Sequence, residues 1–277
     1  MISTVDLLCP LDHSVLKNNQ NSFICAQGHT FDCAKEGYVN LLPVQNKRSK
    51  MPGDNKEMVQ ARKQFLNTNL YEKISDALIN HLHASNNEQT VLDAGCGEGY
   101  YLNRLCKIAQ QKGHSIKGVG LDISKFAIQA AAKRNKDLTW LVASNKLIPL
   151  KDDSLDVLIC AFGFPVYAEF AKKLKSQGKL ILIETAEHHQ KELKNILYPQ
   201  VKPYSELKLQ PAQEHGFIHE TQSKTCYEIN LNKQQIAQLL AMTPHLYRAP
   251  KTGIAAVQAL DFLTLTVDVN IHVFHKA

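Results

Sequence analysis

A glycine-rich turn between a strand-like block and a helix-like block most constrains how this chain folds. The turn reads Asp93-Ala94-Gly95-Cys96-Gly97-Glu98-Gly99, and it follows the apolar residues 90–94 and precedes the helix-like residues 100–111. Glycines allow the backbone to turn tightly and to approach a ligand without side-chain obstruction. The free N–H groups and the dipole of the following helix favour a carboxylate or a phosphate. The turn therefore predicts a ligand-binding loop at the carboxyl end of a strand.

The chain beyond this turn alternates between strand-like and helix-like blocks. We predict strands over 116–122, 140–143, 155–161 and 179–184, and helices over 125–135 and 168–175. Repeated strand–helix units imply a mostly parallel sheet that is covered on both faces. Residues 263–273 alternate strictly between apolar and polar side chains, which predicts an added antiparallel strand with one solvated face.

An acidic residue, Asp122, ends the strand predicted over 116–122, which is the second strand when residues 90–94 are counted as the first. A carboxylate at this place can accept hydrogen bonds from two ribose hydroxyls. A dinucleotide-binding loop would need a further glycine where this chain has Tyr100. The order acid-x-Gly-x-Gly-x-Gly instead resembles motif I of the class I methyltransferases, which bind S-adenosylmethionine. That resemblance implies that Asp93 orients the methionine end, that Gly95, Gly97 and Gly99 pass the sugar and that Asp122 holds the ribose. Asn145, after the third strand, is placed to meet the adenine.

Residues 1–45 are turn-rich and carry two short cysteine motifs, Cys9-Pro10-Leu11-Asp12-His13 and Cys25-Ala26-Gln27-Gly28-His29. Tetrahedral zinc prefers Cys and His ligands drawn from two short knuckles. Cys9, Cys25 and His29 are three candidate ligands. The fourth ligand could be Asp12, His13 or Cys33. Asp12 stands where a knuckle usually has its second cysteine. The alternative is a former zinc knuckle that no longer holds metal.

The N-terminal half carries a more specific array of motifs. It runs from Cys25 to Pro43 and continues with Lys47-Arg48, Pro52-Gly53-Asp54, Met58-x-x-Ala61-Arg62 and Phe65-Leu66. This array resembles the bacterial guanine-N1 methyltransferases of 23S ribosomal RNA, in which a zinc-binding N-terminal domain precedes a class I methyltransferase domain. The resemblance covers nearly the whole chain and includes residues 243–249 and 265–269.

This resemblance implies an α/β fold with a mostly parallel, seven-stranded Rossmann-like sheet and a small zinc-ribbon-like domain. The expected division is an RNA-recognition domain over 1–45, a basic linker and helix over 46–69, and the methyltransferase domain over 70–277. The implied metal ligands are Cys9, Asp12, Cys25 and His29. The residues implied to contact the cofactor, besides those of the loop, are Tyr71, Tyr100 and His189.

The acceptor side of the site is predicted from chemistry. Phe162 and Phe164 follow the fourth strand and could stack on a flipped guanine, although core packing is an equal alternative. Lys47, Arg48 and Lys50 could contact RNA phosphates, or could form a solvated loop. Guanine N1 carries a proton at neutral pH, so methylation there needs a proton acceptor, which the sequence does not name.

Charge and hydropathy exclude few classes of function. The formal net charge of +6 permits a nucleic-acid partner without requiring one. We expect a cytoplasmic protein, because there is no apolar run of membrane-spanning length and no secretory signal. A homodimer is one state that the resemblance leaves open. The alternative functions are a methyltransferase of a small molecule or a protein, and a non-catalytic RNA-binding assembly factor.

Overall fold

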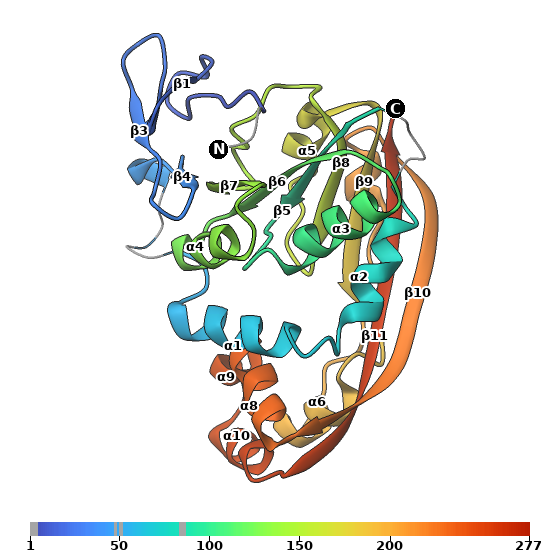
Figure 1. Ribbon diagram of the computed structural model, residues 1–277. Coiled ribbons are helices and arrows are strands. Elements are labelled where there is room, and N and C mark those ends of the chain that lie inside the picture. Colours follow the sequence, from blue (N-terminus) through green and yellow to red (C-terminus); the bar gives the residue numbers. More distant parts are fainter. Residues whose placement is uncertain (1–4, 47–48, 50–51, 83–86) are drawn as a thin grey trace.

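An eight-stranded sheet forms the centre of the molecule (Figure 1). The computed structural model describes residues 5–46, 49, 52–82 and 87–277. From edge to edge the strand order is β10-β11-β9-β8-β5-β6-β7-β4. The strands span β4 Tyr38–Asn40, β5 Gln89–Ala94, β6 Ile116–Asp122, β7 Thr139–Val142, β8 Leu155–Ala161, β9 Leu174–Thr185, β10 Phe217–Asn232 and β11 Phe262–Lys276. The six strands from β4 to β9 run parallel, whereas β11 is antiparallel to β9 and β10 is antiparallel to β11. The mostly parallel sheet and its added antiparallel strand are thereby confirmed.

The number of strands differs from the predicted seven, because the N-terminal segment contributes an eighth. β4 pairs in parallel with β7 and places Val39 opposite Leu141. Tyr38 and Val39 are both buried, and they pack into different core clusters on the two sides of the sheet. The pattern of strand–helix units could not reveal this strand, since its partner lies about a hundred residues later in the chain.

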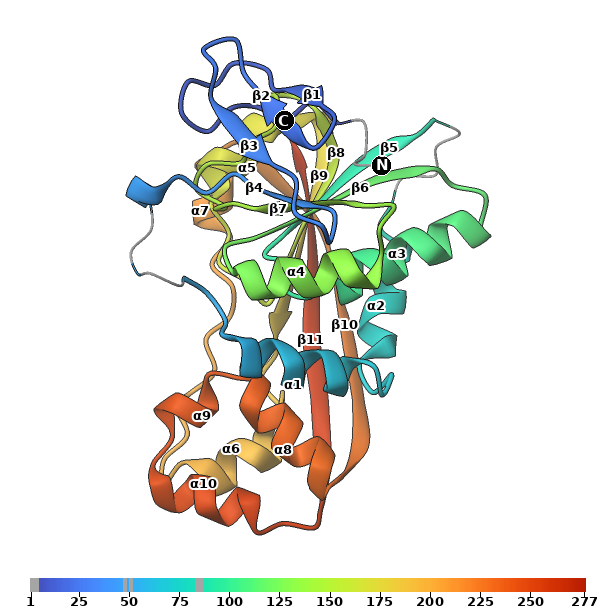
Figure 2. The ribbon, with the colours of Figure 1, turned by 60° about the vertical axis from the view of Figure 1, so that its left-hand side comes forward.

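Helices cover the two faces of the sheet unequally (Figure 2). One core cluster receives α2 (Glu72–Ile79), α3 (Tyr100–Gln111) and α4 (Lys125–Arg134). The other cluster receives only two short helices, α5 (Tyr167–Lys173) and α7 (Gln210–Gln213). The second face therefore needs further apolar cover, because a parallel sheet is stable only when both faces are buried.

The N-terminal segment supplies that cover. A small antiparallel sheet, β1 (Lys17–Asn19), β2 (Ser22–Ile24) and β3 (Thr30–Asp32), lies above this face. The crossover between β7 and β8, residues 143–154, contains no helix. Leu7 instead bridges to Leu150, and the Leu8 N–H donates to the Pro149 carbonyl at 2.9 Å. The N-terminal ribbon thus occupies the place where a crossover helix usually packs.

A group of helices lies below the sheet (Figure 2). It comprises α6 (Lys191–Leu197), α8 (Lys233–Met242), α9 (His245–Arg248) and α10 (Lys251–Gln258). The long strands β10 and β11 reach beyond the parallel sheet to carry this group, and α1 (Lys56–Leu66) lies between it and the sheet. One 3-10 turn, Val44–Asn46, precedes α1. Among the described helices, none combines the length and apolarity that a bilayer span requires.

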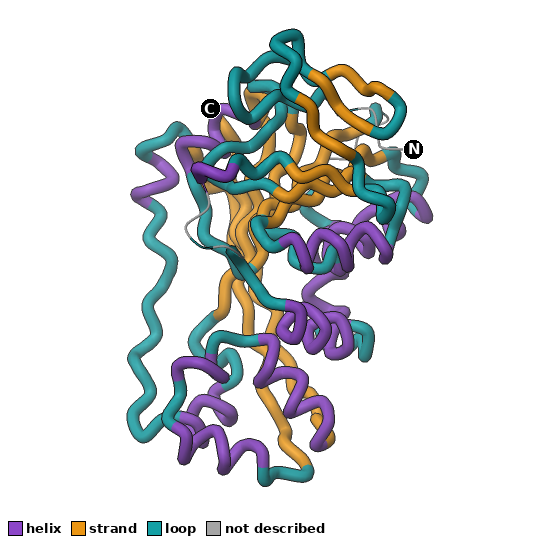
Figure 3. Tube along the Cα trace, turned by 90° about the vertical axis from the view of Figure 1, so that its left-hand side faces the viewer, coloured by secondary structure: helices purple, strands orange, loops and turns teal. Residues whose placement is uncertain are grey.

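The predicted solvated face of the C-terminal strand is wrong. The polar residues Thr266, Asp268, Asn270 and His272 of β11 are all buried. Residues 198–209 run along the molecule from the lower helices to α7 (Figure 3), and Asn270 Nδ2 donates to the Tyr204 hydroxyl of this segment at 3.4 Å. An alternating pattern shows which side chains share a face, but it cannot show whether a distant segment covers that face.

Two glycines make room for the single tryptophan. A Cβ at Gly99 would lie 2.5 Å from Trp140 Cη2, and a Cβ at Gly120 would lie 2.2 Å from Trp140 Cζ3. The Trp140 Nε1–H donates to the Asn135 carbonyl at 2.7 Å, so the indole has little freedom to move away. Trp140 therefore locks the start of α3 and the strands β6 and β7 together.

We expect Gly120→Ala to lower the free energy of unfolding by about 1–3 kcal/mol, because overpacking forces backbone or side-chain shifts. Urea unfolding followed by circular dichroism measures the change. Gly118→Ala on the same strand is the matched comparison and should cost less, since its Cβ would meet the end of the flexible Leu138 side chain at 2.9 Å instead of the rigid Trp140 ring at 2.2 Å. Equal stability of the Gly120→Ala variant and wild type would contradict the packing constraint.

Candidate active site and metal centre

A cavity of about 760 Å³ opens at the carboxyl ends of the parallel strands. Its upper wall consists of the glycine loop after β5, Asp122 at the end of β6, and the segments that follow β7 and β8. Its lower wall consists of residues of α1, of His189, Gln190 and Lys194 around the start of α6, and of residues 242–245. In open α/β sheets this edge is where ligands bind.

The structure brings most of the sequence-predicted cofactor residues together. Tyr71, Asp93, Gly95, Gly97, Tyr100, Asp122, Asn145 and His189 all line the cavity. Gly99 does not line it. This position needs a glycine because its φ of 80° is positive at the N-cap of α3 and because a side chain there would collide with Trp140. The need for glycine at this position therefore comes from packing and not from the approach of a ligand.

Asp122 holds the glycine loop in place. Its Oδ2 accepts a hydrogen bond from the Gly97 N–H at 2.9 Å, and its Oδ1 accepts one from the Ser124 N–H at 2.8 Å. Burial raises the pKa of Asp122, and the two N–H donors oppose that shift. Each carboxylate oxygen can still accept a second hydrogen bond, so Asp122 can fix the loop and contact a ligand together.

Asp93 is the most unusual acid of the cavity. Both of its carboxylate oxygens are buried and have no hydrogen-bond partner among the described residues. Burial, followed by the charges of Asp122 and Glu98, raises the pKa of Asp93 to about 7. A buried carboxylate without a partner is costly. A positively charged ligand group beside Asp93 would relieve that cost, and this fits the sulfonium and ammonium groups of S-adenosylmethionine.

Tyr71 and His189 form a second polar group at the cavity wall. Gln190 Nε2 donates to the Tyr71 hydroxyl at 3.0 Å, and the Tyr71 and His189 rings lie edge to face at 6.2 Å. The Asp268 N–H donates to His189 Nδ1 at 3.2 Å, which leaves the ring proton on Nε2. Burial, followed by the charge of Lys194, lowers the pKa of His189 to about 4. His189 is therefore a neutral hydrogen-bond donor at pH 7.

The two predicted substrate aromatics lie at the cavity rather than in the core. Phe162 is 39% exposed and Phe164 is 88% exposed, and both line the cavity. Phe162 has a positive φ of 54°, which is rare for a bulky residue, and its ring stacks with His189 at a centroid distance of 6.3 Å. Lys47, Arg48 and Lys50, the predicted RNA contacts of the linker, lie outside the described residues.

On the lower wall, sequence reasoning predicted His189 but assigned no role to Arg62, Lys194 or His245. Arg62 forms an ion pair with Asp54, donates to the Met242 carbonyl at 3.0 Å, and lies over the glycine loop, 3.7 Å from where a Cβ of Gly97 would be. Lys194 and His245 also line the cavity from α6 and α9. The motifs that contain Arg62 and His245 are visible in the sequence, but only the fold shows that they face the glycine loop.

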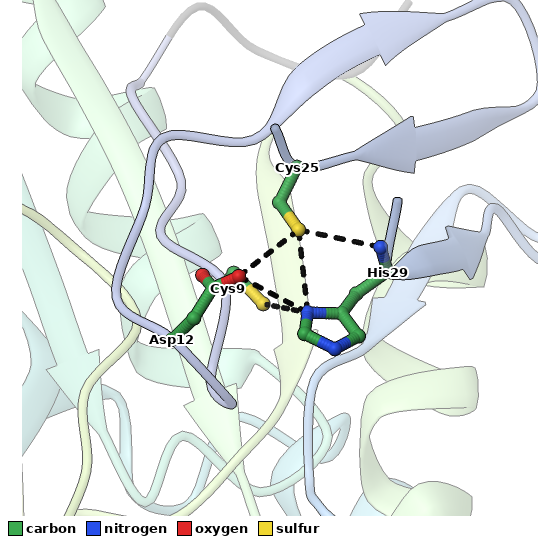
Figure 4. A group of neighbouring side chains, drawn as sticks. All are labelled: Cys9, Asp12, Cys25 and His29. Carbon is green, nitrogen blue, oxygen red and sulfur yellow. Dashed lines mark hydrogen bonds and ion pairs between the residues drawn. The ribbon is translucent and has the colours of Figure 1, made fainter. Parts of the chain in front are cut away.

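Four N-terminal side chains converge on one point (Figure 4). The ligand atoms of Cys9, Asp12, Cys25 and His29 all lie within 4.8 Å of one another. His29 Nδ1 lies 3.5 Å from Cys9 Sγ, 3.3 Å from Cys25 Sγ and 3.1 Å from Asp12 Oδ2. A tetrahedral zinc ion with ligand bonds of about 2.0–2.3 Å would space its ligand atoms about 3.3–3.8 Å apart. The donor set and its spacing therefore fit zinc.

The structure selects Asp12 as the fourth member of this group, and neither His13 nor Cys33 belongs to it. Asp12 Oδ1 accepts hydrogen bonds from the Ser14 N–H at 2.9 Å and from the Ser14 hydroxyl at 2.6 Å. These two bonds hold the pKa of Asp12 well below its usual range. They also leave Oδ2 directed at the cluster, so Ser14 orients the carboxylate for a metal.

We expect zinc to be retained on purification and to depend on Asp12. Asp12→Ala should speed the loss of zinc to a chelator, and Ser14→Ala should weaken binding by roughly 10- to 100-fold, the usual effect of removing a residue that orients a ligand. Asp12→Cys should slow the loss, because it restores a thiolate ligand. Elemental analysis and chelator competition measure these effects, with the exposed Asp32 changed to Ala as control. A folded protein without zinc would contradict the assignment.

Family comparisons agree with the two parts of this architecture. A zinc-ribbon model described as "RlmA, N-terminal" matches residues 7–50, and a methyltransferase-domain model matches residues 85–241. A putative 23S rRNA (guanine-N(1)-)-methyltransferase of Bacillus subtilis, YxjB, is 34% identical over 95% of this chain and 94% of its own. The 23S rRNA (guanine(748)-N(1))-methyltransferase of Streptomyces fradiae is 26% identical over 86% of this chain and 84% of its own. A putative enzyme of the same kind from Micromonospora griseorubida is 27% identical, with coverage of 89% and 88%. The chain therefore belongs to the RNA methyltransferase family in which an RlmA-type zinc ribbon precedes a class I methyltransferase domain.

Proposed function

We propose that this enzyme transfers the methyl group of S-adenosylmethionine to N1 of a guanine in 23S ribosomal RNA. The observation that carries the proposal is the similarity over most of the chain to enzymes named for this reaction. It is combined with a cavity lined both by exposed aromatic rings and by a carboxylate that has no hydrogen-bond partner among the described residues. A methyltransferase of small molecules or proteins is less well supported, because it would not account for the zinc ribbon. A non-catalytic assembly factor would not account for the acidic loop.

The cofactor residues act by position and charge. When bound, S-adenosylmethionine supplies a methyl group on a positively charged sulfur. Asp93 would attract its cationic methionine end, and Asp122 would accept hydrogen bonds from its ribose. Asn145 lies beyond β7, where it would meet the adenine. Tyr71 and the His189 Nε2–H are further polar contacts from the lower wall, and Tyr100 lies at the start of α3.

The acceptor guanine would enter from the side of Phe162 and Phe164. Their exposed rings allow stacking on a base that has been turned out of its helix, which offsets part of the few kcal/mol that unstacking costs. A base stacked there would lie in the same cavity as the residues that would hold the cofactor. Alignment of this kind is the main task of an enzyme that catalyses a displacement.

The remaining parts of the chain extend this proposal. Residues 1–45 would recognise RNA, residues 46–69 would form a linker and helix whose Lys47, Arg48 and Lys50 contact phosphates, and residues 70–277 would carry the reaction. A ribosomal RNA substrate would place the protein in the cytoplasm. The homodimer stays a prediction.

We expect the affinity for S-adenosylmethionine to increase as the pH rises through about 7, because Asp93 ionises there and only the charged carboxylate attracts a cation. Asp93→Asn should remove this rise and cost about 1.5–3 kcal/mol of binding at alkaline pH, the range for a charge-assisted hydrogen bond. Isothermal calorimetry across this pH range measures both effects. The exposed Asp137 changed to Asn is the control. Wild-type affinity in the Asp93→Asn variant would remove Asp93 from the cofactor site.

The proposed reaction is tested by mass mapping of 23S ribosomal RNA from cells that contain or lack this protein. We expect one guanine to lose its methyl group in the deficient cells, with the modification at N1. Complementation with wild type should restore it, and complementation with Asp93→Asn should restore it only weakly. Unchanged methylation in the deficient cells, or a methyl group on a different atom, would contradict the proposal.

A further inference from the structure

The two walls of the cavity differ in chemistry, because one carries acids and the other carries a lysine and two histidines at α6, α9 and the segment before α6. Four acids, Asp54, Asp93, Glu98 and Asp122, line it around the glycine loop. The groups that line it from α6, α9 and the segment before α6 are instead basic, namely His189, Lys194 and His245. The acidic wall suits the cationic cofactor of the proposed function, and the basic wall suits an acceptor on which negative charge develops.

Lys194 is the exceptional group of the basic wall. It is half-buried, and its ammonium has no hydrogen bond or ion pair within the part of the chain that the structure describes. Of the other cations that line the cavity, Arg62 is paired with Asp54, and Lys146 is exposed. Removing an ammonium from water without a partner is costly. A bound substrate can therefore supply the hydrogen-bond acceptor or negative charge that the Lys194 ammonium lacks among the described residues.

The neighbours of Lys194 do not neutralise it. The charge of Lys194 contributes, after burial, to the lowered pKa values of His189 and His245. Arg248 of α9 acts on His245 in the same direction, and the His245 Nδ1 lies 2.8 Å from the Tyr198 hydroxyl. The acids on the same side are engaged elsewhere.

Those acids are Asp268 and Glu192. Asp268 of β11 accepts from the His188 N–H at 3.0 Å and lies 3.2 Å from the Lys224 ammonium. Glu192 of α6 accepts from the N–H and the hydroxyl of Thr266, and lies 3.8 Å from the Lys191 ammonium. Burial lowers the pKa of Lys194 itself. Lys194 therefore loses its charge at a lower pH than an exposed lysine does.

The position of Lys194 places it on the acceptor side. The Phe162 ring, on which we place the guanine, stacks with His189, and Lys194 lines the same cavity from α6, five residues after His189. A guanine on Phe162 would present its Watson–Crick edge, with N1 and O6 side by side, to this wall. When N1 loses its proton, the negative charge is shared with O6.

We propose, on the basis of the guanine-N1 activity proposed above, that Lys194 is a catalytic residue that donates a hydrogen bond to O6 of the target guanine and stabilises its N1-deprotonated form. The N1 proton passes to water at the open side of the cavity. The electron pair that remains on N1 forms the new bond to the methyl carbon. The carbon–sulfur bond breaks and its electron pair stays on sulfur, so that a cation and an anion become two neutral products. A fixed cation beside developing charge is a general source of rate enhancement.

The experiment compares single-turnover methylation of 23S ribosomal RNA by wild type, Lys194→Gln and Lys194→Arg from neutral to alkaline pH. We expect Lys194→Gln to be slower by roughly 10²-fold at neutral pH, the effect of removing one preorganised donor. The difference should shrink at alkaline pH, where guanine loses its N1 proton unaided and Lys194 loses its charge. Lys194→Arg should recover much of the rate, because it keeps the charge. Lys191→Gln, on the exposed side of the same helix, is the matched control.

Calorimetry with S-adenosylmethionine completes the test. Unchanged cofactor affinity in Lys194→Gln, together with the pH-dependent rate loss, supports the assignment. A tenfold loss of cofactor affinity would show that Lys194 contacts the cofactor instead. A rate loss of equal size at every pH would reduce Lys194 to a structural role, and a wild-type rate would remove it from the reaction. If wild type itself leaves guanine N1 unmodified, the proposed function fails, whereas the other negative outcomes overturn only the role of Lys194.

Discussion

The parallel alignment of β4 to β9 is the constraint on which the rest of this structure depends. Parallel strands must all end at the same edge of a sheet, so the segments that follow β5, β6, β7 and β8 meet there although the chain separates them. The glycine loop, Asp122, Asn145 and Phe162 are neighbours for this reason. The packing of Trp140 against Gly99 and Gly120 keeps these strands and α3 in register, and so maintains the shape of the edge.

The second face of the same sheet explains why the zinc ribbon is not a loosely attached module. Leu7, Cys9 and Val39 belong to the core cluster that also contains Leu92 and Leu141 of the central strands. The metal cluster is built on Cys9, a member of that core, and on the knuckle that ends at His29. Order in the ribbon and order in the catalytic domain are therefore coupled through shared apolar burial. A ribbon that recognises RNA would present it to the cavity at a fixed angle.

The charges of the cavity complement the reaction that we propose. Before the ligands bind, Asp93 and Lys194 both lack partners among the described residues, and each loses hydration without compensation. A cationic cofactor and an acceptor that becomes anionic would supply the two missing charges, on opposite walls. Of the two contacts, only that of Lys194 strengthens as guanine N1 loses its proton, and such an interaction lowers the barrier. The positive charge near Asp93 disappears as the carbon–sulfur bond breaks, so Asp93 contributes to cofactor binding.

The sequence by itself determined the strand–helix order, because local periodicity and glycine chemistry act within short segments. The bounds of α3, β6 and β8 are those that the pattern predicts. Motif resemblance also indicated the cofactor residues that line the cavity, and the knuckle spacing indicated three of the four clustered metal donors. Each of these signals comes from residues that are close in the chain or from motifs that are contiguous in the sequence.

Only the tertiary structure decided which distant segments meet. β4 completes the sheet through backbone pairing with β7. Glu192, the His188 N–H and Tyr204 contact Thr266, Asp268 and Asn270 of β11, on the face where alternation had suggested solvent. Asp12, the fourth ligand that the resemblance implies, belongs to the cluster because Ser14 turns its carboxylate inward, a geometry that the spacing of the residues could not reveal. Arg62 and Lys194 reach the cavity because α1 and α6 pack below the sheet, against the helices that β10 and β11 carry. Contacts between segments far apart in the chain depend on how the elements pack, and a single sequence records the elements but not their packing.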